Sequence, residues 1–165
     1  MRDHCQVCGS KLKEDRCKKC GADALEQVVA GFRGYDTVTL LKRGWVNVLL
    51  TNRRLLVFDN LDFAVALASQ GMGGAVGVAV TYKVQNMKTI HNGSKYLDIP
   101  LAQIPSLRRQ RVQKGATAGV HMLVDADGKT HNLWLQDCFT HPGTPPEYFI
   151  DLVSQVSGRP IVDVA

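Results

Sequence analysis

The chain has 165 residues, of which 45% are hydrophobic and 21% charged; this excludes wholesale disorder and allows one ordinary core plus a small appendage. The formal net charge of +5 is compatible with an anionic partner, either nucleic acid or an acidic membrane face, and selects neither. The start MRDHCQVCGSKL has no apolar run behind its charges, so we expect no signal peptide and a cytoplasmic protein. In such a reducing compartment, paired thiols more often hold metal than form disulfides.

Four of the five cysteines lie at the start of the chain, where Cys5, Cys8, Cys17 and Cys20 form the pattern C-x2-C-x8-C-x2-C. Two thiolates two residues apart can face one ion if the backbone turns tightly, and the glycine after each pair lets the chain leave that turn with positive φ. Two such turns close a four-sulfur site that suits Zn²⁺ and leaves no open position for a substrate. The pattern therefore predicts a structural zinc ribbon over residues 1–22, in which the ion replaces a core.

Other uses of these cysteines remain open to different degrees. Rubredoxin-like iron or an iron–sulfur cluster needs the same ligands, so zinc and iron both stay candidates. A thioredoxin-type redox pair would follow a strand, and the few residues before Cys5 cannot form one. Cys138 has no cysteine nearby in the sequence, and we interpret it as a buried apolar residue.

After a linker at residues 23–30, the pattern changes to strands. We expect strands at residues 35–42, 45–51 and 54–58, because these stretches are rich in apolar and β-branched residues. Turn-forming residues at 51–53 join the second and third strands into a hairpin.

Residues 63–82, FAVALASQGMGGAVGVAVTY, contain no charge and four glycines, and we interpret them as an insertion. Their length approaches the roughly 20 residues that cross a bilayer as a helix, but each glycine weakens a lone helix by about 1 kcal/mol. An internal or mobile loop is our first interpretation. Membrane insertion and self-association through closely packed small residues are the alternatives.

The next stretch, 96–104, reads as an extended segment whose prolines confine it to an edge or to short pieces. Residues 107–114 continue as a basic strand. Residues 120–124 and 130–135 flank the turn sequence DADG and predict a second hairpin.

A helix closes the domain. Thr144 and Glu147 are spaced as a capping box with proline at the first helical position, and Gly158 stops the helix before a tail at 159–165. Apolar residues recur between them at helical spacing: Tyr148, Phe149, Leu152, Val153 and Val156. The fold class is therefore mainly β with a C-terminal helix (α+β), in which one helix plugs a small barrel or bent sheet.

Three stretches carry a resemblance to known families. VLLTNRRLLVF resembles the hairpin signature of GRAM-type and bacterial pleckstrin-homology (PH)-like domains, YLDIPLAQIPSLRRQ their I-P-L-x-x-I strand, and VDADGKTHNLWLQD their closing hairpin. CxxCG followed by CxxCG resembles the short zinc-ribbon knuckles. The resemblance implies a PH-superfold-like antiparallel barrel over residues 31–158, capped by one helix, that binds rather than turns over its ligand. The insertion at 63–82 departs from the family pattern.

Basic residues gather on the predicted strand 107–114. In a strand, alternate residues share a face, so Arg109 and Arg111 point one way and Arg108 the other. Together with Lys114 these residues form a candidate patch for phosphates or lipid headgroups, each contributing about 1 kcal/mol at a membrane. Our first interpretation, however, is a solvated edge strand that its charges protect from aggregation.

The sequence contains few patterns that indicate catalysis. A dyad of Cys138 and His131 can be drawn on the last hairpin, but Cys138 is explained by the core, and Asp125 and Asp127 by the turn. The sequence contains no phosphate loop, paired-carboxylate spacing or nucleophile elbow, so we expect no enzyme.

These patterns together predict a cytoplasmic, peripherally membrane-associated adaptor with a zinc ribbon, which recognises a membrane surface or a protein partner. The alternatives are a nucleic-acid-associated zinc-ribbon factor and a structural subunit that self-assembles through residues 63–82. Nucleic acid is favoured less, because the ribbon has no aromatic residue among its basic ones for base stacking.

Overall fold

The computed structural model describes residues 4–12, 15–23, 25–37, 44–60, 94–115 and 118–165. In these residues, eight strands form one hydrogen-bonded sheet in the order β4-β3-β2-β1-β7-β6-β5-β8. The strands are β1 (Val28–Asp36), β2 (Gly44–Thr51), β3 (Arg54–Asp59), β4 (Lys95–Pro100), β5 (Leu107–Val112), β6 (Gly119–Ala126), β7 (Lys129–Cys138) and β8 (Ile161–Val164).

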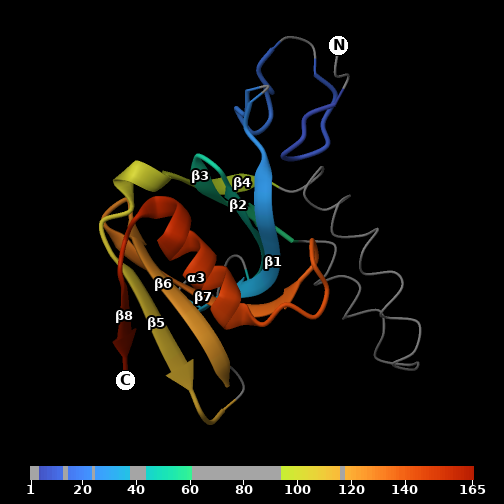
Figure 1. Ribbon diagram of the computed structural model, residues 1–165. Coiled ribbons are helices and arrows are strands. Elements are labelled where there is room, and N and C mark those ends of the chain that lie inside the picture. Colours follow the sequence, from blue (N-terminus) through green and yellow to red (C-terminus); the bar gives the residue numbers. More distant parts are fainter. Residues whose placement is uncertain (1–3, 13–14, 24, 38–43, 61–93, 116–117) are drawn as a thin grey trace, which may run out of the picture.

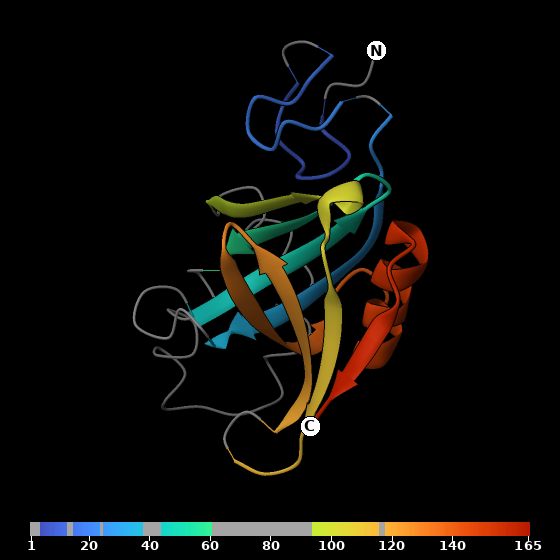
Figure 2. The same ribbon diagram turned by 90° about the vertical axis from the view of Figure 1, so that its left-hand side faces the viewer.

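The sheet curls into a half-barrel, and the helix α3 (Pro146–Ser157) lies in its hollow (Figures 1 and 2). A short 3-10 turn, η2 (Leu101–Gln103), follows β4. Neighbouring strands are antiparallel except for β5 and β8, which are parallel. The predicted class, mainly β with a C-terminal helix, is confirmed.

Strands β2 and β3 are apolar on both faces. Leu55 and Val57 point into the core inside the curl, whereas Leu56 and Phe58 point to the outside of the sheet, and all four are fully buried. A strand covered on both sides reads as a continuous apolar run, as RLLVF does. Burying each such side chain contributes roughly 1.5–3 kcal/mol.

The first strand lies earlier in the chain than predicted. β1 covers residues 28–36, so it begins inside the predicted linker 23–30, and residues 38–42 of the predicted strand lie outside the described residues. Gly34 interrupts the apolar pattern of β1 because a Cβ there would lie 2.6 Å from the backbone oxygen of Trp134 on β7. The close approach of β7 therefore explains Gly34. The same glycine breaks the apolar pattern that would otherwise indicate this strand in the sequence.

Both predicted hairpins are present. β2 and β3 are joined at Asn52 and Arg53, with Leu50 opposite Leu55. β6 and β7 are joined at Asp127 and Gly128, whose φ values of 52° and 72° fit the primed turn that a two-residue hairpin loop prefers.

Helix α3 begins with a different cap from the one predicted. Its N-cap is Pro145, which makes no side-chain cap hydrogen bond, and the hydroxyl of Thr144 donates instead to the carbonyl of His141 at 2.7 Å. The loop before the helix uses that hydroxyl, so the capping box does not form. Phe149 packs on Phe32 of β1 with ring centroids 4.9 Å apart, and the helix ends at Gly158 in the left-handed conformation, as predicted.

Residues 159–165, assigned to a tail from the sequence, contain strand β8. Arg109 on β5 holds Asp163 of β8 through two hydrogen bonds of 2.6 and 2.9 Å. The insertion at 63–82 lies outside the described residues. Among the helices that the structure describes, none is long and apolar enough to cross a membrane.

Candidate functional site

The two cysteine pairs form two matching turns. The amide of Gly9 donates to the carbonyl of Cys5 at 2.9 Å, and the amide of Gly21 donates to that of Cys17 at 2.7 Å. Gly9 and Gly21 have φ values of 73° and 74°, which glycine adopts without strain. Each turn therefore brings its two sulfurs to the same side, as the spacing predicts.

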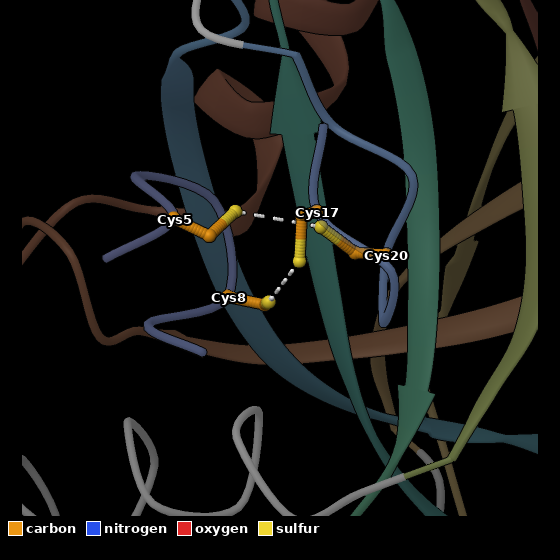
Figure 3. A group of neighbouring side chains, drawn as sticks. All are labelled: Cys5, Cys8, Cys17 and Cys20. Atoms are coloured by element: carbon orange, nitrogen blue, oxygen red, sulfur yellow. Dashed lines mark hydrogen bonds between the residues drawn. The ribbon is translucent and has the colours of Figure 1, made fainter. Parts of the chain in front are cut away.

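The four sulfurs face one another (Figure 3). The ligand atoms of Cys5, Cys8, Cys17 and Cys20 all lie within 4.8 Å of one another, and all four residues are buried. The sulfurs of Cys5 and Cys20, and those of Cys8 and Cys17, are 3.6 Å apart. Four buried sulfurs at this separation can hold one metal ion.

The pKa values of the thiols in this cluster shift in opposite directions. The hydrogen bond with Cys20 lowers the pKa of Cys8 to about 4, whereas the same contact, together with burial, raises the pKa of Cys20. Burial likewise raises the pKa of Cys5. Four adjacent thiolates repel one another, so a dication among them is the group that allows all four to ionise.

The ribbon packs against the outside of the sheet (Figures 1 and 2). Its cysteines, with Val7 and Ala22, form one buried cluster with Leu49 of β2 and Leu56 and Phe58 of β3. The sheet thus supplies the apolar neighbours that a ribbon of about twenty residues cannot supply for itself.

Arg54 lies where the ribbon, the following segment and the sheet meet. Its Nε and Nη2 donate to the two carboxylate oxygens of Glu26 at 2.8 and 2.9 Å, and its Nη1 donates to Asp98 on β4 at 2.8 Å. Burial opposes its charge, but the hydrogen bonds and charge of Glu26, and then the charge of Asp98, raise the pKa of Arg54. The sequence pattern LTNRRL thus contains an architectural arginine, whose partners lie far from it in the chain.

The basic patch predicted on the strand at 107–114 is largely ion-paired. Arg108 pairs with Asp125 on β6 at 2.8 Å, and Arg111 lies 3.9 Å from Glu147. Arg109 pairs with Asp163 and, at 3.3 Å, with Asp151. The four residues do not converge: Arg108 and Arg109 meet carboxylates on different faces of the strand, and Lys114 lies exposed beyond its end.

The imagined dyad of Cys138 and His131 does not form. His131 Nδ1 lies 3.5 Å from a carboxylate oxygen of Asp36, while Cys138 Sγ lies 3.3 Å from Thr140 Oγ1. The amide of His141 also donates to Cys138 Sγ, at 3.2 Å. Cys138 is buried, as its interpretation as a core residue requires.

The structure also contains a groove that the sequence analysis missed. It has a volume of about 720 Å³ and lies between the start of β1, the loop after β7 and α3. Its apolar lining includes Val29, Pro142, Pro145, Tyr148 and Leu152. The sequence carried no signal for it, because Tyr148 stands in the apolar series of the helix and only the structure shows that it is 51% exposed.

No protein-family model matches the chain, and neither does any curated protein. Among solved structures, the hSac2 domain from the human phosphoinositide phosphatase Sac2 is similar over 87% of this chain and 81% of that chain. The two are 10% identical in sequence, with a TM-score of 0.46.

Proposed function

We propose that this protein is a non-catalytic binding protein: a ribbon held by structural zinc, on a PH/GRAM-like domain that recognises a protein partner. The observation that carries the proposal is the buried set of four cysteine sulfurs packed on the sheet. Four sulfur ligands suit zinc and complete its tetrahedral shell, so the ion would staple the fold and take no substrate.

The PH/GRAM-like part of the proposal is supported by where the family motifs fall. The TNRR motif forms the turn between β2 and β3, and the DADG motif forms the turn between β6 and β7. The helix that resembles the family's closing helix fills the hollow of the curled sheet.

A protein partner is favoured over an anionic surface by the charges on β5. Arg108 and Arg109 are engaged by carboxylates of the chain itself, so a headgroup or a nucleic-acid phosphate would have to displace them. The groove beside α3 instead offers apolar side chains and the half-exposed ring of Tyr148. Tyrosine side chains that become buried when a partner binds, surrounded by a polar rim, are typical of protein interfaces.

The proposal is tested with a photo-crosslinking amino acid placed in the groove at Leu152, in the cell that makes the protein. The matched control carries the crosslinker at Gln155, which is exposed on the same helix. The proposal expects one discrete protein adduct from position 152 that is absent at 155. Equal labelling at both positions, or binding of the purified protein to anionic vesicles or DNA that Arg109→Met reduces tenfold, would contradict it.

A further inference from the structure

The outer faces of β2 and β3 are unusually apolar where the ribbon covers them. An antiparallel sheet with one face on its core commonly turns polar residues outward on the other. Here the outward residues include Leu49, Leu56 and Phe58, each at most 1% exposed, beside the buried polar residues Asn47 and Thr51. The chain therefore builds a second apolar surface, which the ribbon covers together with Phe139.

Within the part of the chain that the structure describes, the ribbon forms little regular secondary structure of its own. Within its described residues, the backbone pairing consists of two isolated bridges, His4 with Lys11 and Arg16 with Asp23. Its buried side chains are mostly the cysteines themselves, with Val7 and Ala22. A segment with so small a core would be kept in place by a bound ion and by the surface beneath it.

Two cations from the sheet reach the second turn of the ribbon. A Cβ built on Gly21 would lie 3.6 Å from Arg54 Nη1, so the guanidinium packs directly against this turn. Lys95 Nζ donates to the carbonyl of Cys20 at 3.4 Å and to Asp98 at 2.5 Å. A zinc ion with four thiolates carries two excess negative charges, and both cations face this turn while they also pair with Glu26 and Asp98.

We propose that the ribbon is a metal-dependent lid over the outer face of β2 and β3, and that Arg54 is the positioning residue that couples metal binding to closure. This inference rests on the metal site of the proposed function. With metal bound, the lid is closed and the outer face is dry. Without it, the thiols lose their common ligand, the lid opens and Leu49, Leu56 and Phe58 meet water, while the core inside the curl stays intact.

The role of Arg54 is tested by the rate at which zinc-loaded protein gives up its metal to a chromophoric chelator. Replacing Arg54→Met should speed release by about 10- to 100-fold, the usual effect of removing a group that supports metal ligands. The matched control is Arg109→Met, which removes an equally bidentate ion pair near the opposite edge of the sheet and should leave the rate unchanged. Equal rates for Arg54→Met and the unmodified protein would overturn the role of Arg54.

The lid itself is tested on the full chain, loaded with zinc or stripped under reducing conditions, by fluorescence of a dye that binds apolar surfaces. Stripping should raise the dye signal severalfold while thermal unfolding stays cooperative, and readdition of zinc should reverse the change. Phe58→Gln, or Leu56→Gln if that variant fails to fold, should reduce the dye signal of the stripped protein.

Two outcomes would overturn the lid. If the stripped protein stays folded and binds no dye, the ribbon remains docked without metal. If the stripped protein loses cooperative unfolding, the metal stabilises the whole chain and not the ribbon alone. A protein that takes up no metal at all would instead refute the metal site of the proposed function.

Discussion

Each cysteine of the ribbon contributes more to the stability of this segment than its size suggests, because few other side chains of the segment are buried. The ligand spacing and the following glycines predicted this site directly, since the turn that aligns two sulfurs depends only on neighbouring residues. The partners of Arg54 could not be predicted in that way. Glu26 and Asp98 are 28 and 44 residues away from it, and only the folded sheet brings them together.

Cys17→Ser should abolish stoichiometric zinc binding, because three thiolates leave the tetrahedral shell incomplete. Elemental analysis of the purified variant measures this directly. Cys138→Ser is the matched control, since Cys138 is buried on β7 away from the four-sulfur set, and it should retain its zinc. Full zinc content in Cys17→Ser would mean that this residue is not a ligand.

Asp125→Asn should lose an acid-sensitive part of the stability. Hydrogen bonds from Thr130 and Ser106, and the charge of Arg108, lower the pKa of Asp125 below its usual 3.8. A lowered pKa stabilises the fold above the unfolded value, and this contribution disappears as the pH falls through the folded value. Asp125 is about one-third exposed, so the contribution is at most about 1 kcal/mol.

The measurement for Asp125 is the free energy of unfolding in urea, for the unmodified protein and the variant, at about pH 6 and about pH 2.5. The difference between the two proteins should be largest at the higher pH and smaller at the lower one. A difference that is the same at both would contradict the assignment.

Gly34→Ala should destabilise the sheet by about 1–3 kcal/mol, the usual cost of forcing an extra carbon into a packed site. The new Cβ would lie 2.6 Å from the carbonyl oxygen of Trp134, and backbone cannot rotate away as a side chain can. Thermal unfolding measures the loss. An unchanged midpoint would mean that β1 and β7 do not approach each other this closely.

At the scale of elements, the two hairpins were predictable from the sequence. The first and last strands of the sheet, β1 and β8, were not. A hairpin is specified by apolar alternation and a short turn, both of which are local. β1 carries glycines that only its neighbours explain, and β8 is a four-residue strand whose place depends on parallel pairing with β5, more than fifty residues away. Patterns within a short window cannot show either dependence.

Deletion of residues 161–165 should destabilise the protein by about 1–3 kcal/mol, in the range of a lost ion pair and strand contacts. The deletion removes the bidentate pair between Arg109 and Asp163 and leaves β5 as an open edge. Open edges promote association, so light scattering should also show more aggregate on heating. Asp163→Asn keeps the strand and is the control; if it loses as much stability as the deletion, the ion pair rather than the strand accounts for the effect.

At the scale of the whole molecule, the ribbon and the curled sheet pack against each other. The sequence analysis treated them as a small appendage and a separate domain, because no local pattern marks Leu56 and Phe58 as facing a ribbon rather than a core. The structure joins them through a shared apolar cluster and the ion pairs of Arg54. Under the lid that we propose, access to the outer sheet face depends on whether the cysteines hold a metal ion.

The metal centre is tested most directly by X-ray absorption at the zinc edge, combined with metal content per chain. The account predicts one zinc per chain and a first shell of four sulfurs at about 2.3 Å. A nitrogen or oxygen ligand in that shell, or purified protein that contains no zinc and takes none up, would contradict it.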